Sequence, residues 1–220
     1  MKRIDIVVEG QTEQEFVSQI IQPYLTNKYG IYSVSAILIG SFKHRGGNVK
    51  FERLKKNITL LSHQTDLVIS TFLDYFKLGN DFPHFEACQK KLNTDERIDC
   101  LERELTNAID NRFFVPYIQK YEFEALLFAS VDGYEKYITA KACQRLEAIL
   151  QEFPNPEDIN NTMPPSYRLL EPFGQYENSK YNKVTLGNIL ALETGIEKIL
   201  ERCPRFGAWI EKLAHMATQA

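Results

Sequence analysis

Acidic side chains directly follow apolar segments at three points of the sequence. Glu9 follows the first apolar run, Asp74 ends a later one, and Glu122 and Glu124 come after a third. Carboxylates gathered at one place repel one another unless a cation neutralises them, and oxygen ligands of this kind suit Mg²⁺ or Mn²⁺. Such a site can activate water and stabilise a pentavalent phosphate. Each acid alone is more typical of a solvated strand end, and only their joint occurrence favours a metal site.

Strand and helix patterns alternate around these acids. We expect strands at residues 4–8, 33–39, 66–74 and 113–119, and helices at residues 13–28, 48–61 and 95–110. This alternation predicts an α/β fold with a mostly parallel sheet flanked by helices. Because the carboxyl ends of parallel strands meet at one edge of a sheet, the acids are expected to lie at the same edge.

The first helix has the clearest local signals. Thr12 is expected to cap it, with Glu15 three residues later completing a capping box. Its apolar residues recur every four positions, at Phe16, Ile20 and Tyr24, which predicts that these side chains face the core.

The pattern changes in the second half of the chain. We expect the α/β domain to occupy residues 1–130 and a helical extension, residues 131–220, to pack on it. Residues 141–150 are predicted to be helical, and Gly195 and Pro204 are predicted to interrupt the last helical stretch. Trp209 belongs to an apolar stripe with Phe206 that predicts a buried face on the terminal helix.

Composition limits the classes of function. The chain of 220 residues has 26 basic and 29 acidic side chains and a net charge of −3, so a polyanion site must be a local patch. The four cysteines are widely spaced, without a C-x-x-C pair, and are expected to be reduced thiols. We find neither a signal peptide nor a membrane-spanning run, and expect a cytoplasmic protein with no membrane partner.

The motifs resemble those of the Toprim domain, the metal-binding fold of topoisomerases, bacterial primases and OLD-type nucleases. The sequence is most similar to a small bacterial family of Toprim-like proteins of uncharacterised function. The resemblance rests on the order and spacing of short motifs along nearly the whole chain: Val8-Glu9-Gly10-x-Thr12-Glu13, Leu73-Asp74 before Asp81-Phe82-Pro83, Glu122-Phe123-Glu124-Ala125-Leu126-Leu127-Phe128, and Cys203-Pro204-x-Phe206-x-x-Trp209.

The resemblance implies a role for each acid. Glu9 would be the general acid or base at the scissile phosphate, and Asp74 would bind Mg²⁺ or Mn²⁺. Glu124 would be the third acid, with Glu122 as its competitor. Toprim domains usually carry Asp-x-Asp at the second motif, whereas Asp74 is followed by Tyr and Phe, so Asp81 from the next loop is a candidate replacement ligand.

The substrate side is expected to be basic. Gly10 and Thr12 lie beside Glu9 and are candidate substrate contacts. A basic segment between the second strand and its helix could bind phosphates through Arg45, Gly47 and Lys50. A second, weaker candidate is an aromatic and basic segment that contains Lys180 and Lys183. A solvated helix face and a polar loop have the same compositions, and these plainer interpretations stay open.

Two functions from different classes follow. The first is a metal-dependent Toprim-like phosphodiesterase, a nuclease acting on DNA or RNA, which by resemblance would work with an ATPase partner in bacterial defence or repair. The alternative is a non-catalytic module that binds a partner protein or nucleic acid, which the missing second aspartate favours. Nucleotidyl transfer of the primase kind is a third, less favoured hypothesis.

Overall fold

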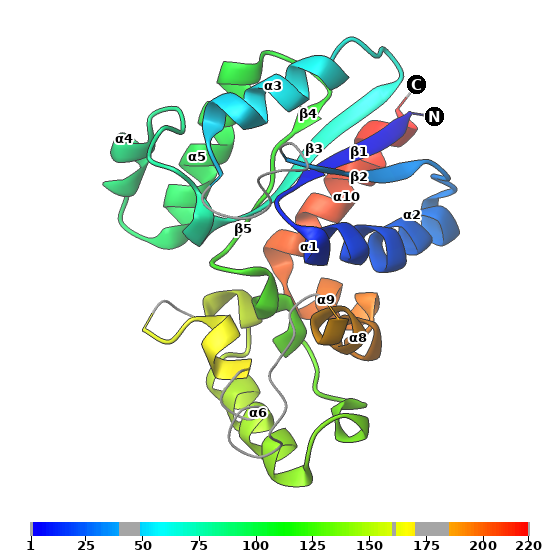
Figure 1. The fold of residues 1–220 in the computed structure, drawn as a ribbon, viewed down its shortest axis with the longest axis vertical. Helices are drawn as coiled ribbons and strands as arrows, with labels where there is room; N and C mark the ends of the chain where they lie inside the picture. Colours follow the sequence, from blue (N-terminus) through cyan, green and yellow to red (C-terminus); the bar gives the residue numbers. More distant parts are fainter. Residues whose placement is uncertain (1, 40–48, 160–161, 170–184, 220) are drawn as a thin grey trace. The chain divides into compact units, whose positions relative to one another are not determined.

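The computed structural model describes residues 2–39, 49–159, 162–169 and 185–219. The chain divides into two compact units (Figure 1). The first contains Met1–Lys120 together with Trp209–Ala220, and the second contains Tyr121–Ala208. We expected the α/β domain to extend to about residue 130, whereas the second unit begins at Tyr121 and the last residues of the chain belong with the sheet.

A parallel sheet forms the centre of the first unit, which confirms the predicted α/β class. Its strands are β1 (Arg3–Val8), β2 (Val34–Leu38), β3 (Leu67–Asp74), β4 (Phe114–Val115) and β5 (Ile118–Gln119). The strand order is β2-β1-β3-β4, with β5 also paired to β3, and every pairing is parallel. The single fourth strand that we expected is split in two at Pro116, because proline has no N–H to donate to the ladder.

Helices cover both faces of this sheet (Figure 1). They are α1 (Gln11–Phe16), α2 (Gln22–Tyr29), α3 (Phe51–Leu61), α4 (Phe85–Gln89) and α5 (Thr94–Ile109), with a short 3₁₀ turn η2 (Tyr75–Lys77) after β3. The face covered by α3 and α5 buries a cluster that includes Val7, Ile69, Leu73, Leu54, Ile58, Leu101 and Leu105. The apolar residues that recur with helical spacing along α3 and α5 are therefore buried against the sheet.

The first helix is interrupted by a π-helical turn, η1 (Val17–Ile21), between α1 and α2. Such a turn inserts one extra residue into the helix and rotates everything after it. Phe16 and Ile20 are buried as predicted, but beyond the turn Leu25 is buried and Tyr24 is only half-buried. The expected spacing of four fails at Tyr24 for this reason.

Trp209 anchors the C-terminal helix α10 (Pro204–Thr218) to the other face of the sheet. Its ring stacks on Tyr117, with centroids 4.4 Å apart, and lies 5.5 Å from Phe72. Its Nε1 donates a hydrogen bond of 2.9 Å to Oγ of Ser70. Trp209 is 3% exposed, so the predicted buried stripe is confirmed.

The second unit is helical among its described residues. It contains 3₁₀ turns η3 (Phe123–Phe128), η4 (Tyr134–Lys136) and η5 (Pro156–Asp158), and helices α6 (Ala140–Glu152), α8 (Thr185–Thr194), α9 (Ile196–Arg202) and the start of α10. Buried Tyr134 donates a hydrogen bond to the Leu127 carbonyl at 2.7 Å and lies 3.0 Å from the Thr194 hydroxyl. Gly195 and Pro204 separate the last helices as predicted.

The cysteines depart from our expectation of four reduced thiols. Cys88 of α4 and Cys100 of α5 form a disulfide, while Cys143 and Cys203 are free and buried. The two partners are twelve positions apart, and the chain between them folds α4 back against α5, which brings the two Cα atoms to 5.5 Å, within the range that a disulfide spans. Spacing along the sequence could not indicate this pairing, because it depends on how the two helices meet.

Candidate functional site

Glu9 and Asp74 lie at the carboxyl ends of neighbouring strands. β1 and β3 pair in register from Arg3 with Leu67 to Val8 with Phe72, so Glu9, the residue after β1, lies beside the last two residues of β3, Leu73 and Asp74. The connection from β1 leads to β2 on one side, whereas β3 lies on the other side of β1. This is the switch point of an open α/β sheet, where ligands bind beyond the strand ends.

Lys77 joins the two carboxylates. Its Nζ lies 3.0 Å from Oε1 of Glu9 and 3.3 Å from Oδ2 of Asp74. The acids are sheltered, with side chains 9% and 1% exposed, whereas the Lys77 side chain is 36% exposed. Two buried acids thus converge on one cationic nitrogen, and sequence reasoning missed this residue although it follows Asp74 by three positions.

The carboxyl group of Glu9 is poised between its two protonation states. Burial raises its pKa from the ordinary value of 4.5 to about 7, and the Asp74 carboxylate adds to the rise, although Lys77 acts in the opposite direction. Oε2 of Glu9 is buried and has no hydrogen-bond partner among the described residues. A carboxyl group with this pKa can gain or release a proton near neutral pH.

The turn after Glu9 brings a further acid close. Glu13 is buried and also raises the pKa of Glu9. A Cβ atom on Gly10 would lie 3.0 Å from Oε2 of Glu13, so glycine leaves room for this carboxylate. Gly10 itself precedes the first residue of α1, and Thr12 is buried inside the helix. The predicted Thr12 cap is therefore wrong, because the chain becomes helical two residues earlier than we expected.

The start of α3 adjoins the Lys77 turn. The Val49 N–H donates to the Lys77 carbonyl at 2.8 Å, which places the neighbouring Lys50 beside this turn. Lys50 and Arg53 are exposed, so basic side chains are available at this edge of the unit. Candidates Arg45 and Gly47 lie outside the described residues.

Asp81 serves the same helix start. Its Oδ2 accepts a hydrogen bond of 3.1 Å from the Phe51 N–H, the first amide of α3. A carboxylate at a helix N-terminus is favourable because the helix dipole places positive charge there. This contact uses an amide that could otherwise have bound a phosphate and gives Asp81 a structural role, and its proposed role as a metal ligand stays a prediction.

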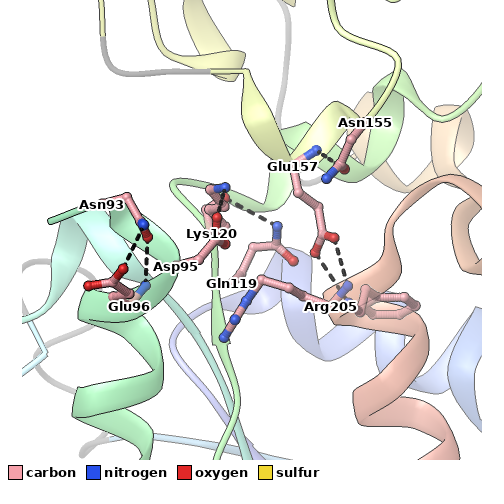
Figure 2. Close-up of polar contacts among 9 residues, drawn as sticks. Asn93, Asp95, Glu96, Gln119, Lys120, Asn155, Glu157 and Arg205 are labelled. Carbon is pink, nitrogen blue, oxygen red and sulfur yellow. Dashed lines mark hydrogen bonds and ion pairs between the residues drawn. The ribbon is translucent and has the colours of Figure 1, made fainter.

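A second lysine lies at the same sheet edge. Gln119 pairs in register with Asp74, and Lys120 follows it. The Lys120 side chain is 6% exposed and its Nζ lies 2.7 Å from Oδ2 of Asp95, in the first turn of α5 (Figure 2). Asn93 caps that helix by accepting a 2.9 Å hydrogen bond from the Glu96 N–H. The capped first turn of α5 therefore holds Asp95 in position beside Lys120.

The remaining candidate acids belong to the second unit. Oε2 of Glu122 accepts a hydrogen bond of 3.0 Å from the Ser166 N–H. Glu124 lies inside η3 and is 1% exposed, which is unusual for a carboxylate. The two candidates for the third acid thus differ in their surroundings. Glu122 binds the backbone at Ser166, whereas Glu124 is the buried acid. Lys180 and Lys183 lie outside the described residues.

The family model for DUF4276, described as a domain of unknown function, matches residues 8–214. The chain belongs to this family. No curated protein and no solved structure gives a significant match to it. In the described parts of this DUF4276 chain, we find no helix both long enough and apolar enough to cross a membrane.

The donor atoms of this DUF4276 site are carboxylate oxygens, the type of ligand that hard cations prefer. Glu9 and Asp74 direct carboxylate oxygens at a single cationic atom, and Mg²⁺ is often held by one or two carboxylates with water and phosphate completing the shell. Among the described residues no group of three or more acidic, histidine or cysteine side chains is arranged to hold a metal. The two carboxylates thus provide a partial ligand set whose centre is close to the Lys77 ammonium.

Proposed function

We propose that this DUF4276 chain is a metal-dependent phosphodiesterase related to Toprim nucleases, acting on DNA or RNA. One observation carries the proposal: Glu9 and Asp74, from adjacent parallel strands at the switch point, converge on a single cation position. Phosphodiester hydrolysis uses such a position to neutralise the charge that develops on the phosphate.

Each residue has a distinct role in this proposal. Mg²⁺ or Mn²⁺ bound to the carboxylates would polarise the phosphate and lower the pKa of a bound water. Asp74, buried at the end of β3, is the fixed ligand. Glu9 would be the general acid or base, as the resemblance implies, and burial raises its pKa to about 7 before a metal binds.

The basic residues at the start of α3 supply the substrate contacts. Lys50 and Arg53 are exposed beside the turn that carries Lys77. Cations in this position attract a phosphate backbone, which matters because the net charge of −3 provides no general attraction. The resemblance further implies Glu124 as the third acid and an ATPase partner in bacterial defence or repair.

A second function, binding of a partner protein or nucleic acid without catalysis, is favoured by Lys77 itself. An ammonium already offsets part of the negative charge of the two acids. In addition, Phe76 stands where Toprim domains carry their second aspartate, and its side chain is partly exposed. A fold that had lost its metal could retain the acids through this ion pair.

Cleavage assays separate the two functions. Plasmid DNA, linear DNA and RNA are incubated with Mg²⁺ or Mn²⁺ and with wild type, Glu9→Gln or Asp74→Asn. The control is Asp66→Asn, which removes an exposed acid just before β3, at the opposite end of the strand. We expect metal-dependent cleavage by wild type and the control, and about a hundredfold or greater loss in the two site variants.

The pattern of results identifies the function. Equal cleavage by all four proteins would indicate a contaminating nuclease and contradict the proposed site. Absence of cleavage together with absence of Mn²⁺ binding by calorimetry would favour the binding module.

A further inference from the structure

The Lys77 ammonium lies between the two acids to which the proposed metal would bind. Its Nζ contacts one oxygen of each acid, at 3.0 Å from Glu9 and 3.3 Å from Asp74. The second oxygen of Glu9, Oε2, is buried and has no hydrogen-bond partner among the described residues. The Glu9 side chain, which is 9% exposed, therefore retains the capacity to accept a further contact.

An ammonium and a divalent ion cannot share this position. When both acids are ionised, the two carboxylates and one ammonium carry a formal charge of −1, which attracts a further cation. A divalent ion that bound the same oxygens would lie within about 4 Å of the ammonium, where the repulsion between the two cations is strong. Binding of the metal therefore requires Lys77 to leave.

The structure provides a route for that departure. The Lys77 backbone is held in place, because its carbonyl accepts the Val49 N–H at 2.8 Å. The side chain is 36% exposed, whereas the two acids are almost completely buried. A long flexible side chain with its base fixed and one side open to solvent can rotate outward without a change in the fold.

We propose that Lys77 is an internal counter-ion that a divalent metal displaces, so that this side chain sets the metal concentration at which the site is loaded. Without metal, Lys77 holds the two acids together. With metal, its ammonium moves outward to the edge where Lys50 is exposed and can contact a substrate phosphate. The inference rests on the proposed metal-dependent function and adds a regulator to the same site.

Calorimetric titration with Mn²⁺ tests the exchange without any assay of activity. Wild type is compared with Lys77→Met and Lys77→Gln, which remove the charge, and with Lys77→Arg, which retains it. Lys56→Met is the matched control, because Lys56 is an exposed lysine of α3. We expect the Met and Gln variants to bind Mn²⁺ about tenfold or more tightly than wild type, with the Arg variant and the control close to wild type.

Thermal unfolding gives a second readout. Without metal, the neutral Lys77 variants should unfold at a lower temperature than wild type, because the repulsion between Glu9 and Asp74 is no longer offset. Mn²⁺ should raise their unfolding temperature by more than that of wild type. Circular dichroism checks that each variant is folded, and the Gln variant replaces the Met variant if the latter is not.

The outcomes distinguish this inference from the proposed function. If wild type and the neutral variants bind Mn²⁺ equally, or the neutral variants bind it more weakly, the proposed displacement of Lys77 is wrong, whereas the proposed metal site is supported. If the neutral variants bind Mn²⁺ and wild type does not, the inference is supported in its strongest form. If no protein binds metal, the exchange and the metal-dependent function both fail.

Discussion

The Lys77 ammonium lies 3.3 Å from the carboxylate of Asp74, three residues earlier in the chain. Asp74 immediately precedes the 3₁₀ turn η2, and Lys77 ends it. Side chains three positions apart lie above one another in a 3₁₀ turn, so this short element aligns the lysine with the acid. The same nitrogen reaches Glu9 on the neighbouring strand. A local turn thus provides the cation that joins two strands.

Stability should depend on pH through Glu9. Its folded pKa of about 7 lies above the value of 4.5 expected for an unfolded chain, so between these values the folded state binds more protons. Stability from this group is therefore lost as pH rises through that window, by at most about 3 kcal/mol. Urea unfolding at about pH 5 and about pH 8 should show that Glu9→Gln gains stability relative to wild type at the higher pH. An equal difference at both pH values would contradict the raised pKa.

Replacement of Trp209 should destabilise the sheet unit strongly. Trp209→Ala removes a buried ring stacked 4.4 Å from Tyr117 and its hydrogen bond to Ser70, at an expected cost of about 3–5 kcal/mol. Ser70→Ala leaves the rings in place and should cost less. Because Trp209 is the single tryptophan, unfolding is followed by far-ultraviolet circular dichroism. A loss below about 1 kcal/mol in the alanine variant would exclude this anchoring role.

Reduction of the disulfide should lower stability by about 2–3 kcal/mol, because the Cys88–Cys100 bond closes a short loop in the unfolded chain. Thermal unfolding with and without a reductant measures the effect, and Cys88→Ser should be insensitive to the reductant.

Titration of thiols in denaturant should find two in the oxidised protein, Cys143 and Cys203. In the native protein Cys203 should react slowly, since burial raises the pKa of its thiol and nearby Glu157 adds to the rise. Four thiols would contradict the pairing.

Glu157 should act as the anionic cap of α10. It is fully buried, and its two oxygens accept hydrogen bonds from the Arg205 and Phe206 N–H groups at 2.8 Å and 3.2 Å (Figure 2). Glu157→Gln removes the charge from a helix N-terminus and should cost about 1–2 kcal/mol, and Glu157→Ala more. Urea unfolding measures both changes. The neighbouring, exposed Asp158 provides a control, and Asp158→Asn should have a smaller effect than Glu157→Gln.

Local sequence patterns determined much of the fold. Alternating apolar and amphipathic segments predicted the strands that carry Glu9 and Asp74 and the helices between them, because a buried strand and a half-buried helix each require a characteristic spacing. Where a single residue changes the geometry, the pattern was not sufficient. Pro116 divides the predicted fourth strand, and the π-helical turn moves the buried face from Tyr24 to Leu25.

The tertiary structure alone decided which residues meet. Lys77 contacts Glu9, 68 positions away, only because β1 and β3 are neighbours in the sheet, and Cys88 reaches Cys100 only because α4 folds back on α5. Glu157 caps a helix that begins far along the chain, at Pro204. Periodicity reports the environment of each segment, whereas these contacts depend on how segments pack. The sequence by itself thus determined which acids are candidates and which strands carry them. The packing of the strands determined that a lysine lies between these acids.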